Sequence, residues 1–413
     1  MRIRVRNFGP VKAGYKVGEG YLDIPQITLF CGPQGSGKST VTKLISTFSW
    51  VEKRMFKDDD IAYDADRFKV DLAWQGIDEY LCDDTEIDFE GMIVGFHYAE
   101  QKMRVEDLRK EHKTYSKPKI SYMPAERNIS SVIRKATRVE NLPEPLMCMQ
   151  TEFEWAKRFF KRDYKLPANG FGFEYDGEDS WISNGGPGTS QKTRLDKASS
   201  GLQSMTPLLM VSEYLATKIV PDGANVSKLV LEEARSSDEK LAIEMRVDEI
   251  QRSGRPETEK DELIARVKGP CRRFMNIVEE PEQNLYPLAQ YEVVKGLIRL
   301  QKKCPGNSLV LSTHSPFVVN TMVMAAMSAI VYRKARAKKD YALLARLAEK
   351  WPEDCSVRGE DMALYELDER GLIKRLSTSR GLFSDANKLN AFLGEWNDGF
   401  NDLVQLELEA DVR

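Results

Sequence analysis

Apolar and polar residues alternate at the start of the chain, where RIRVRNF at residues 2–8 has the period of a strand with one exposed face. A second extended segment, ITLFC at 27–31, is apolar throughout, as a buried strand is. The Gly-rich GYKVGEG between them predicts two strands joined by a turn. Apolar residues then recur at helical spacing in KSTVTKLISTFSW at 38–50. The pattern therefore predicts a strand, a Gly-rich turn and a helix in that order.

The same alternation of strands and helices continues through the middle of the chain. The sequence predicts a helix over 204–219 and another within 286–303. Strands are expected at 119–123, 274–278 and 308–312, the first ending at Pro124. Strands that alternate with helices are typical of an α/β fold, so we predict a mixed sheet flanked by helices.

Two segments between these elements have another pattern. Residues 128–197 predict an irregular insertion with exposed loops, because NGGPG at 184–188 is rich in turn residues. The polar tract 226–268 contains two helical candidates, which favours a solvated helical hairpin. An apolar stretch follows at 304–332, but Pro, Gly, Asn and His interrupt it, and we interpret it as a buried strand followed by a buried helix rich in Met.

Charge and cysteine content narrow the class of protein. The 413 residues carry 61 Lys+Arg and 64 Asp+Glu, a formal net charge of −3, which excludes a histone-like basic chain and an acidic disordered one. Any contact with DNA must therefore use a local basic patch. The six cysteines lack the spacing of a zinc or redox motif, and the first residues lack a signal-peptide core. We expect a cytoplasmic protein with free thiols and no membrane partner.

The strongest motif lies between the second strand and the first helix. It matches GxxxxGK[ST] and consists of Gly32, Pro33, Gln34, Gly35, Ser36, Gly37, Lys38 and Ser39, with Thr40 next. In this pattern the glycines let backbone N–H groups surround a phosphate, and the helix N-terminus adds a favourable dipole. Lys38 would reach the β- and γ-phosphates, and Ser39 would offer its hydroxyl to Mg²⁺. The alternative, a structural Gly-rich turn, would not require Lys38 and Ser39.

A second motif places two carboxylates, Glu279 and Glu280, at the end of the strand FMNIV. Two acids this close raise each other's pKa unless a cation or a proton accompanies them. We expect Glu279 to hold Mg²⁺ through its water shell and Glu280 to deprotonate an attacking water. Taken alone, the pair could equally be a solvated loop.

Two further motifs complete the set. His314 ends the apolar strand SLVLST and could sense a γ-phosphate, although a lone histidine is usually structural. The segment ASSGLQS at 198–204 opens a helix with Ser200, Gly201 and Gln203. It is either a second anion site or a helix N-terminus without a ligand.

Together and in this order, the four motifs resemble the soluble branch of ATP-binding-cassette ATPases, which includes the SMC, RecF and overcoming-lysogenisation-defect proteins. GPQGSGKST resembles Walker A, SSGLQ the cassette signature, VEEPEQNLYP the Walker B and D-loop, and STHSPF the switch histidine. The resemblance implies that Gly35–Thr40 bind ATP phosphates, that Glu280 and His314 are catalytic with Lys38, and that Ser39 and Glu279 hold Mg²⁺. It also implies that Ser200, Gly201 and Gln203 close over the nucleotide of a second subunit, in a homodimer with two ATP molecules.

The resemblance divides the chain into four predicted parts. They are an N-terminal ATPase lobe (1–127), an insertion (128–197), a second lobe with signature, Walker B and switch His (198–330) that includes a helical insertion (217–268), and a helical or mixed cap (331–413). The chain departs from the family pattern in Glu279, where Asp is usual, and in Leu202, where Gly is frequent. No Q-loop residue can be placed, and Arg127 lies where nucleotide- or dimer-contacting residues occur in similar proteins.

Three functions remain open. The chain has no room for a long coiled coil between Arg127 and the signature, and its acids after Asn320 do not form a Toprim nuclease motif. We therefore favour an ATPase that controls a separate nuclease or toxin, as compact ATPases of anti-phage systems such as PARIS and Septu are thought to do. The alternatives are a RecF-like DNA-binding repair ATPase, which would use basic runs such as RKARAKK at 333–339, and the ATPase subunit of a transporter.

Overall fold

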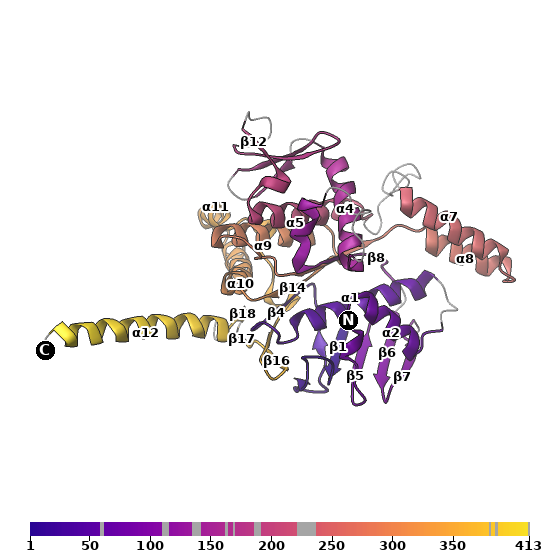
Figure 1. The fold of residues 1–413 in the computed structure, drawn as a ribbon, viewed down its shortest axis with the longest axis horizontal. Helices are drawn as coiled ribbons and strands as arrows, with labels where there is room; N and C mark the ends of the chain where they lie inside the picture. Colours follow the sequence, from indigo (N-terminus) through magenta and orange to yellow (C-terminus); the bar gives the residue numbers. More distant parts are fainter. Residues whose placement is uncertain are drawn as a thin grey trace.

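A seven-stranded sheet separates two apolar cores (Figure 1). The structure, a computed structural model, describes residues 1–57, 62–109, 115–133, 142–161, 164–167, 170–185, 191–220, 237–379, 381–384 and 387–411. The sheet has the order β2-β16-β15-β4-β14-β13-β8. Its strands are β2 (Gly14–Tyr15), β4 (Ile27–Cys31), β8 (Pro118–Met123), β13 (Arg273–Glu279), β14 (Ser308–Thr313), β15 (Met362–Leu367) and β16 (Leu372–Arg375).

Neighbouring strands from β15 to β8 run parallel, whereas β16 runs antiparallel to β15. Parallel strands need helices on both faces, and the helices that follow β4, β13 and β14 supply them. They are α1 (Lys38–Lys57), α9 (Pro287–Lys302) and α10 (Pro316–Ala337). The predicted α/β class and the predicted core strands are confirmed.

A second, antiparallel sheet covers α1 on its far side. It has the order β3-β1-β5-β6-β7, with β1 (Arg2–Arg6), β3 (Leu22–Asp23), β5 (Glu86–Glu90), β6 (Val94–Ala99) and β7 (Lys102–Asp107). Helix α1 and the short α2 (Ala65–Trp74) pack with this sheet in one core, where Phe48, Phe68 and Phe89 stack.

The prediction that one Gly-rich turn joins the first two long strands is wrong, because β2 and β3 lie between them; β1 pairs with β3 and β5 and not with β4. The burial patterns give the reason. Strand β4 is buried on both faces and fits only the interior of a sheet, whereas β1 alternates and fits a sheet with one solvated face.

The other face of the seven-stranded sheet is covered by α4 (Glu144–Phe160), α5 (Ser200–Thr217), α9 and α10 (Figure 1). The insertion expected to be irregular thus supplies α4, and it adds a small sheet of β9 (Tyr164–Lys165), β10 (Gly172–Tyr175), β11 (Ser180–Ser183) and β12 (Lys192–Arg194). The short helix α3 (Ile129–Val132) precedes α4. Part of the NGGPG stretch lies outside the described residues.

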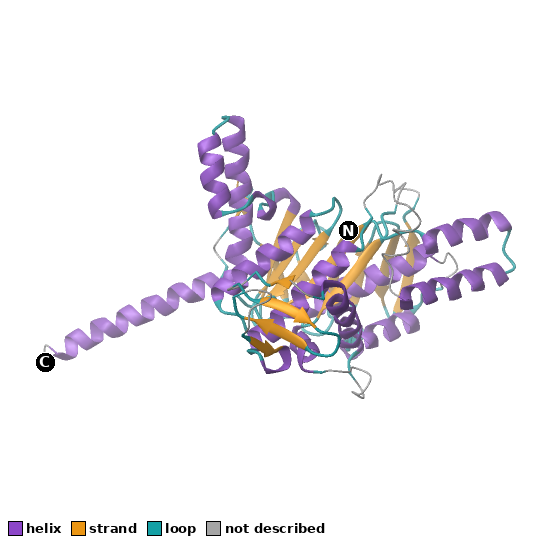
Figure 2. Cartoon of the chain, turned by 90° about the horizontal axis from the view of Figure 1, so that it is seen from above, coloured by secondary structure: helices purple, strands orange, loops and turns teal. Residues whose placement is uncertain are grey.

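Three helical segments project from this body in different directions (Figure 2). The predicted hairpin is present as α7 (Ser237–Arg252) and α8 (Glu257–Lys268), with residues 221–236 outside the described part. The second segment is the end of α10 with α11 (Tyr341–Lys350), and the third is α12 (Lys388–Asp411).

The C-terminal region is more than the expected cap. Strand β15 lies between β4 and β16 inside the main sheet, so this region completes the core; a short pair, β17 (Thr378–Ser379) and β18 (Leu382–Phe383), follows. The run MALYEL that forms β15 is buried except for the partly exposed Glu366, and the charged residues on both sides of it hide this strand in the sequence. The boundaries at 127, 197 and 330 remain predictions.

Judged by length and composition alone, one helix in the described residues, α10, is long and apolar enough to cross a membrane. Its residues Val318, Val319 and Met322 are fully buried against the main sheet, and Ser315 caps its first turn. The expected helix is present, but it is buried on one face only, because Met324 and Met327 are 48% and 47% exposed.

Candidate functional site

The Gly-rich loop joins the end of β4 to the start of α1. Gly32, Gly35 and Gly37 have φ angles of 143°, 75° and 97°, which side-chain-bearing residues rarely adopt. A Cβ on Gly32 would also collide with the carbonyl oxygen of Leu367, which ends β15. The loop therefore delivers its chain directly to the N-terminus of α1, where the first N–H groups have no partner within the helix and favour an anion.

Lys38 is the first residue of α1, and its side chain folds back over the loop. The Nζ atom donates to the carbonyl oxygens of Gly32 at 3.0 Å and Pro33 at 2.7 Å. The residue is only 4% exposed, and burial lowers the pKa of its ammonium group to about 8. A buried cation at the N-terminus of a helix is suited to bind a phosphate.

Thr42, which the sequence did not single out, connects the start of α1 to Glu279. Its hydroxyl is 3.0 Å from the backbone carbonyl oxygen of Ser39 and 3.3 Å from Oε1 of Glu279. The first turn of α1, which carries Ser39, and the end of β13 therefore lie side by side. They do so because β4, which leads into α1, and β13 are both parallel neighbours of β14, so their carboxyl ends share one edge of the sheet.

The hydroxyl oxygen of Ser39 and the carboxylate oxygens of Glu279 are suitable ligands for Mg²⁺, the ion expected from the sequence. Hydroxyl and carboxylate oxygens suit Mg²⁺, which keeps several waters and takes further ligands from substrate phosphates. In the part of the chain that is described, no three His, Cys, Asp or Glu residues form a group able to hold a metal alone. Ser39 and Glu279 thus fit a Mg²⁺ ion that arrives with a phosphate, and not a permanent protein-only metal site.

A continuous chain of three side chains crosses the site from α1 to the end of β13. Nδ1 of His314 is 3.3 Å from Nζ of Lys38, and Nε2 of His314 is 3.1 Å from Oε1 of Glu280. Three predicted catalytic residues, up to 276 positions apart along the chain, are therefore linked through His314, which contacts both Lys38 and Glu280.

The contacts determine where the protons lie. The Lys38 ammonium group can only donate, so Nδ1 of His314 accepts, and Nε2–H is left to donate to Glu280. This hydrogen bond from His314 lowers the pKa of Glu280 below its usual value. Glu280 is therefore a carboxylate at neutral pH and accepts a hydrogen bond from His314.

The backbone of Glu280 is strained and is fixed from both sides. Its φ angle is +44°, a left-handed conformation that is unfavourable for a residue with a long side chain. Its N–H donates to the carbonyl oxygen of Ser312 at 2.8 Å, and its own carbonyl accepts from Nη2 of Arg127 at 2.6 Å. Backbone strain of this kind persists only where surrounding contacts hold it in place, and it occurs mostly at functional sites.

Arg127 has a different place from the one expected. The residue was expected to contact a nucleotide or a second subunit, but it is fully buried in the turn after β8. Its Nη1 also donates to the carbonyl oxygen of Glu279 at 2.7 Å, and burial lowers its pKa to about 10. Arg127 is thus a positioning residue that holds the backbone of both glutamates.

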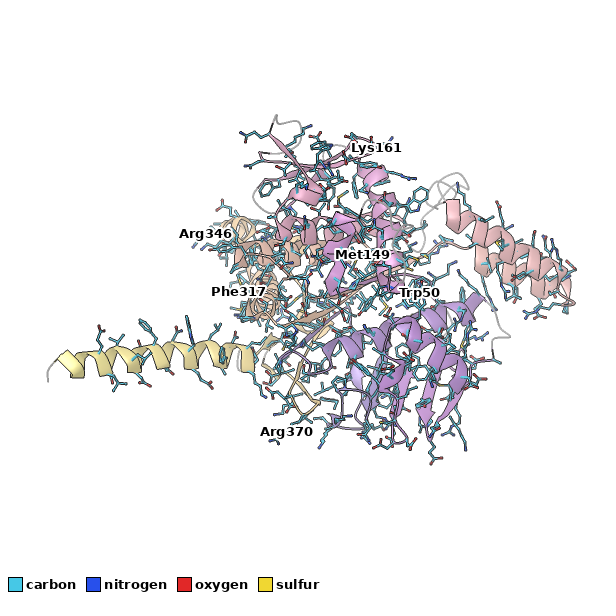
Figure 3. All side chains as sticks on the ribbon, viewed as in Figure 1. Trp50, Met149, Lys161, Phe317, Arg346 and Arg370 are labelled. Atoms are coloured by element: carbon cyan, nitrogen blue, oxygen red, sulfur yellow. The ribbon has the colours of Figure 1, made fainter. Side chains whose placement is uncertain are left out.

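We expect Arg127→Ala to destabilise the protein by about 3 kcal/mol, because it leaves two buried carbonyl groups without donors and opens a cavity. Urea unfolding followed by circular dichroism measures the change. The matched control is Arg346→Ala on exposed α11, which should unfold at the parental urea concentration (Figure 3). Equal unfolding midpoints for the two variants would contradict the positioning role.

Glu282 is a site residue that the sequence reasoning missed. Its Oε1 accepts from the Thr313 hydroxyl and from the backbone N–H of His314, both at 2.7 Å. Burial raises the pKa of this carboxyl group. Glu282 therefore orients the segment that carries His314, and the available signal was the third acid in VEEPE.

The predicted signature opens helix α5 at a separate place. Ser200 is exposed. Gly201 lies so close to the carbonyl oxygen of Asn284 that a Cβ atom on it would be 2.7 Å away. The side-chain amide of Gln203 donates to the carbonyl oxygen of Leu195 at 3.2 Å. Across the described residues, no hydrogen bond or ion pair joins these three residues to Lys38, Glu280 or His314. The single chain brings together Walker A, the glutamates and His314, but not the signature.

A comparison with known proteins finds solved structures that are similar to this chain. No family model matches the sequence, and no curated protein matches it. The chain is similar to the SMC head domain from Thermotoga maritima, with 10% identity, a TM-score of 0.35, and coverage of 92% of this chain and 98% of that one. It is also similar to an SMC head bound to the C-winged helix domain of ScpA (9% identity, TM-score 0.41, coverage 92% and 97%). A nucleotide-free ATP-binding cassette from an ABC transporter is a third (12% identity, TM-score 0.28, coverage 92% and 93%).

Proposed function

We propose that this protein is a cytoplasmic ATPase that binds ATP with Mg²⁺ at the Gly-rich loop and hydrolyses it. The observation that carries this proposal is the contact chain Lys38–His314–Glu280 at the N-terminus of α1. It puts a phosphate-binding cation and an ionised carboxylate within one site, linked by a histidine; the cation can bind the phosphates, and the carboxylate can accept a proton from the attacking water.

Each residue has a role that its contacts support. The loop N–H groups and Lys38 bind and orient the phosphates, while Ser39 and Glu279 hold Mg²⁺, which neutralises charge on the phosphates when bound. Glu280, kept ionised by His314, accepts a proton from the attacking water. His314 lies between Lys38 and Glu280, so it is placed to respond when the γ-phosphate leaves.

The exposed signature favours a composite site in a homodimer. Ser199 and Ser200 are exposed at the N-terminus of α5, a position that a second copy of the chain could use to cover a bound nucleotide. Each subunit would then supply half of two ATP sites.

We expect the Glu280→Gln variant to form a dimer in ATP and to remain smaller without it, because ATP stays bound between the subunits. Light scattering of the wild type and the variant, with and without ATP, measures the mass. Ser200→Arg, which places a bulky cation at the exposed signature, should abolish the ATP-dependent dimer. An assembly whose mass does not respond to ATP would argue against the composite site.

The proposal extends to control of a separate effector, a nuclease or a toxin, in defence against phage. The support is a set of four ATPase motifs in a chain whose remaining sequence shows no nuclease motif, with insertions that can contact a partner. A nuclease or toxin gene beside this one, whose product co-purifies in an ATP-dependent manner, is the expected finding.

A RecF-like DNA-binding ATPase is the second candidate. The last turn of α10 and the turn that follows it expose five basic residues, Arg333, Lys334, Arg336, Lys338 and Lys339. Binding to duplex DNA that requires ATP, weakens with salt and is lost on reversal of Lys338 and Lys339 would favour this function over effector control.

A further inference from the structure

A cleft of about 510 Å³ opens beside strand β8, and the candidate catalytic residues do not line it. Five consecutive residues of β8, 119–123, border the cleft. Successive side chains of a strand point to opposite faces of a sheet. Five consecutive residues can border one cleft only if the cleft lies along the edge of the strand, where the backbone is.

This edge is open in the described part of the chain. Strand β8 ends the order of the seven-stranded sheet, and its one hydrogen-bonded neighbour there is β13. The backbone groups of residues 120–123 on its other side therefore face the cleft without a strand partner among the described residues. An unpaired strand edge is a template for the addition of a further strand.

The walls of the cleft are helices from the two faces of the sheet. Trp50 of α1 and Trp74 of α2 line one wall, and Met147 and Met149 of α4 line the other. Figure 3 labels Trp50 and Met149 on these two helices. Trp50 is 43% and Met147 is 40% exposed, so two large apolar side chains stand open at the mouth. Such walls fit the alternating apolar side chains of an extended peptide.

One polar group in the cleft also lacks a partner. Gln75 is only 3% exposed, its Nε2 donates to Ser46 at 3.4 Å, and its Oε1 has no hydrogen-bond partner among the described residues. A buried acceptor without a donor is costly, and a peptide with an N–H or O–H side chain would satisfy it.

We propose that this cleft binds an extended segment of a partner protein, which adds a strand to the open edge of β8. Backbone hydrogen bonds to β8 would hold the segment, and apolar side chains would enter between Trp50 and Met147. A strand edge selects a peptide over a small apolar molecule, because a small molecule would supply few hydrogen bonds to the backbone groups of residues 120–123.

The position of the cleft connects the partner to the candidate ATP site. Strand β8 leads directly into the turn that carries Arg127, which holds the carbonyl groups of Glu279 and Glu280. An added strand would restrain β8 and so the placement of Glu280. This regulatory consequence rests on the proposed function, whereas the binding of a strand does not.

The test uses the full chain without nucleotide, so that it is independent of ATP binding. Peptides are selected from a random phage-displayed library on the wild type, with counter-selection on the Trp50→Ala/Met147→Ala double variant. A selected peptide is then synthesised, together with a version in which alternate backbone amides are N-methylated, and indole serves as the small-molecule probe. Fluorescence anisotropy of the labelled peptides and competition by indole measure binding.

We expect the peptide to bind, N-methylation to weaken it by at least about tenfold, and Trp50→Ala to do the same. Backbone amides within 119–123 should gain protection from hydrogen exchange when the peptide is bound. The matched control is Val70→Ala, which removes a 61% exposed apolar side chain of α2 outside the cleft and should leave affinity unchanged. Equal binding of the N-methylated peptide, displacement by indole alone, or failure to select any cleft-dependent peptide would overturn the proposal.

Discussion

Glu280→Gln should slow ATP hydrolysis by about 10²- to 10⁴-fold, the usual contribution of a general base, while ATP remains bound. The amide oxygen of glutamine can still accept the hydrogen bond from Nε2 of His314, so the geometry of the site is retained. What is lost is the carboxylate that accepts a proton from water. Phosphate release measures turnover, and equilibrium binding of a fluorescent ATP analogue measures affinity.

The control for this substitution is Glu126→Gln, which neutralises an exposed carboxylate in the turn next to Arg127. It carries the same change in charge close to the site and should leave turnover within about twofold of the parental rate, as surface substitutions generally do. Hydrolysis by Glu280→Gln at the rate of this control would show that Glu280 is not the base.

Lys38→Ala is expected to abolish nucleotide binding, with a loss in affinity of at least about a hundredfold. Charge-assisted hydrogen bonds to phosphate are the strongest contacts available to the site, and alanine can supply none of them. Isothermal titration with ATP and Mg²⁺ measures the loss. Lys43→Ala is the matched control on the same helix, since Nζ of Lys43 donates to the carbonyl oxygen of Gln75 outside the loop. Retention of ATP binding by Lys38→Ala would refute the phosphate site.

The same variant should also change how stability depends on pH. Burial lowers the pKa of Lys38 to about 8 in the folded protein, whereas an unfolded lysine titrates near its ordinary value of 10.5. Between these values the unfolded chain binds more protons, so the folded wild type gains stability relative to Lys38→Ala as pH rises. The full gain is about 3 kcal/mol, present above pH 10.5 and absent below pH 8. Urea unfolding of both proteins without nucleotide, at several pH values, measures it.

Local sequence determined the elements and the motifs. The GxxxxGK[ST] pattern fixed the turn between β4 and α1, because glycines with positive φ and a helix start are properties of adjacent residues. The apolar runs at 274–278 and 308–312 became buried parallel strands, and a continuous apolar run is likewise a property of adjacent residues. Fold class, loop and three of the catalytic candidates therefore needed no knowledge of distant contacts.

The tertiary structure alone decided what surrounds these residues. Strand β15 entered the main sheet and β1 left it for another, since pairing partners are chosen by burial across the whole domain. Arg127 became a buried support of Glu279 and Glu280, because a guanidinium group can enter a core only where several carbonyl groups converge on it. Walker A, the two glutamates and His314 were readable from spacing. The contacts of Thr42 with Glu279 and of Glu282 with His314, and the open edge of β8, depend on which strands become neighbours. No local pattern encodes that choice.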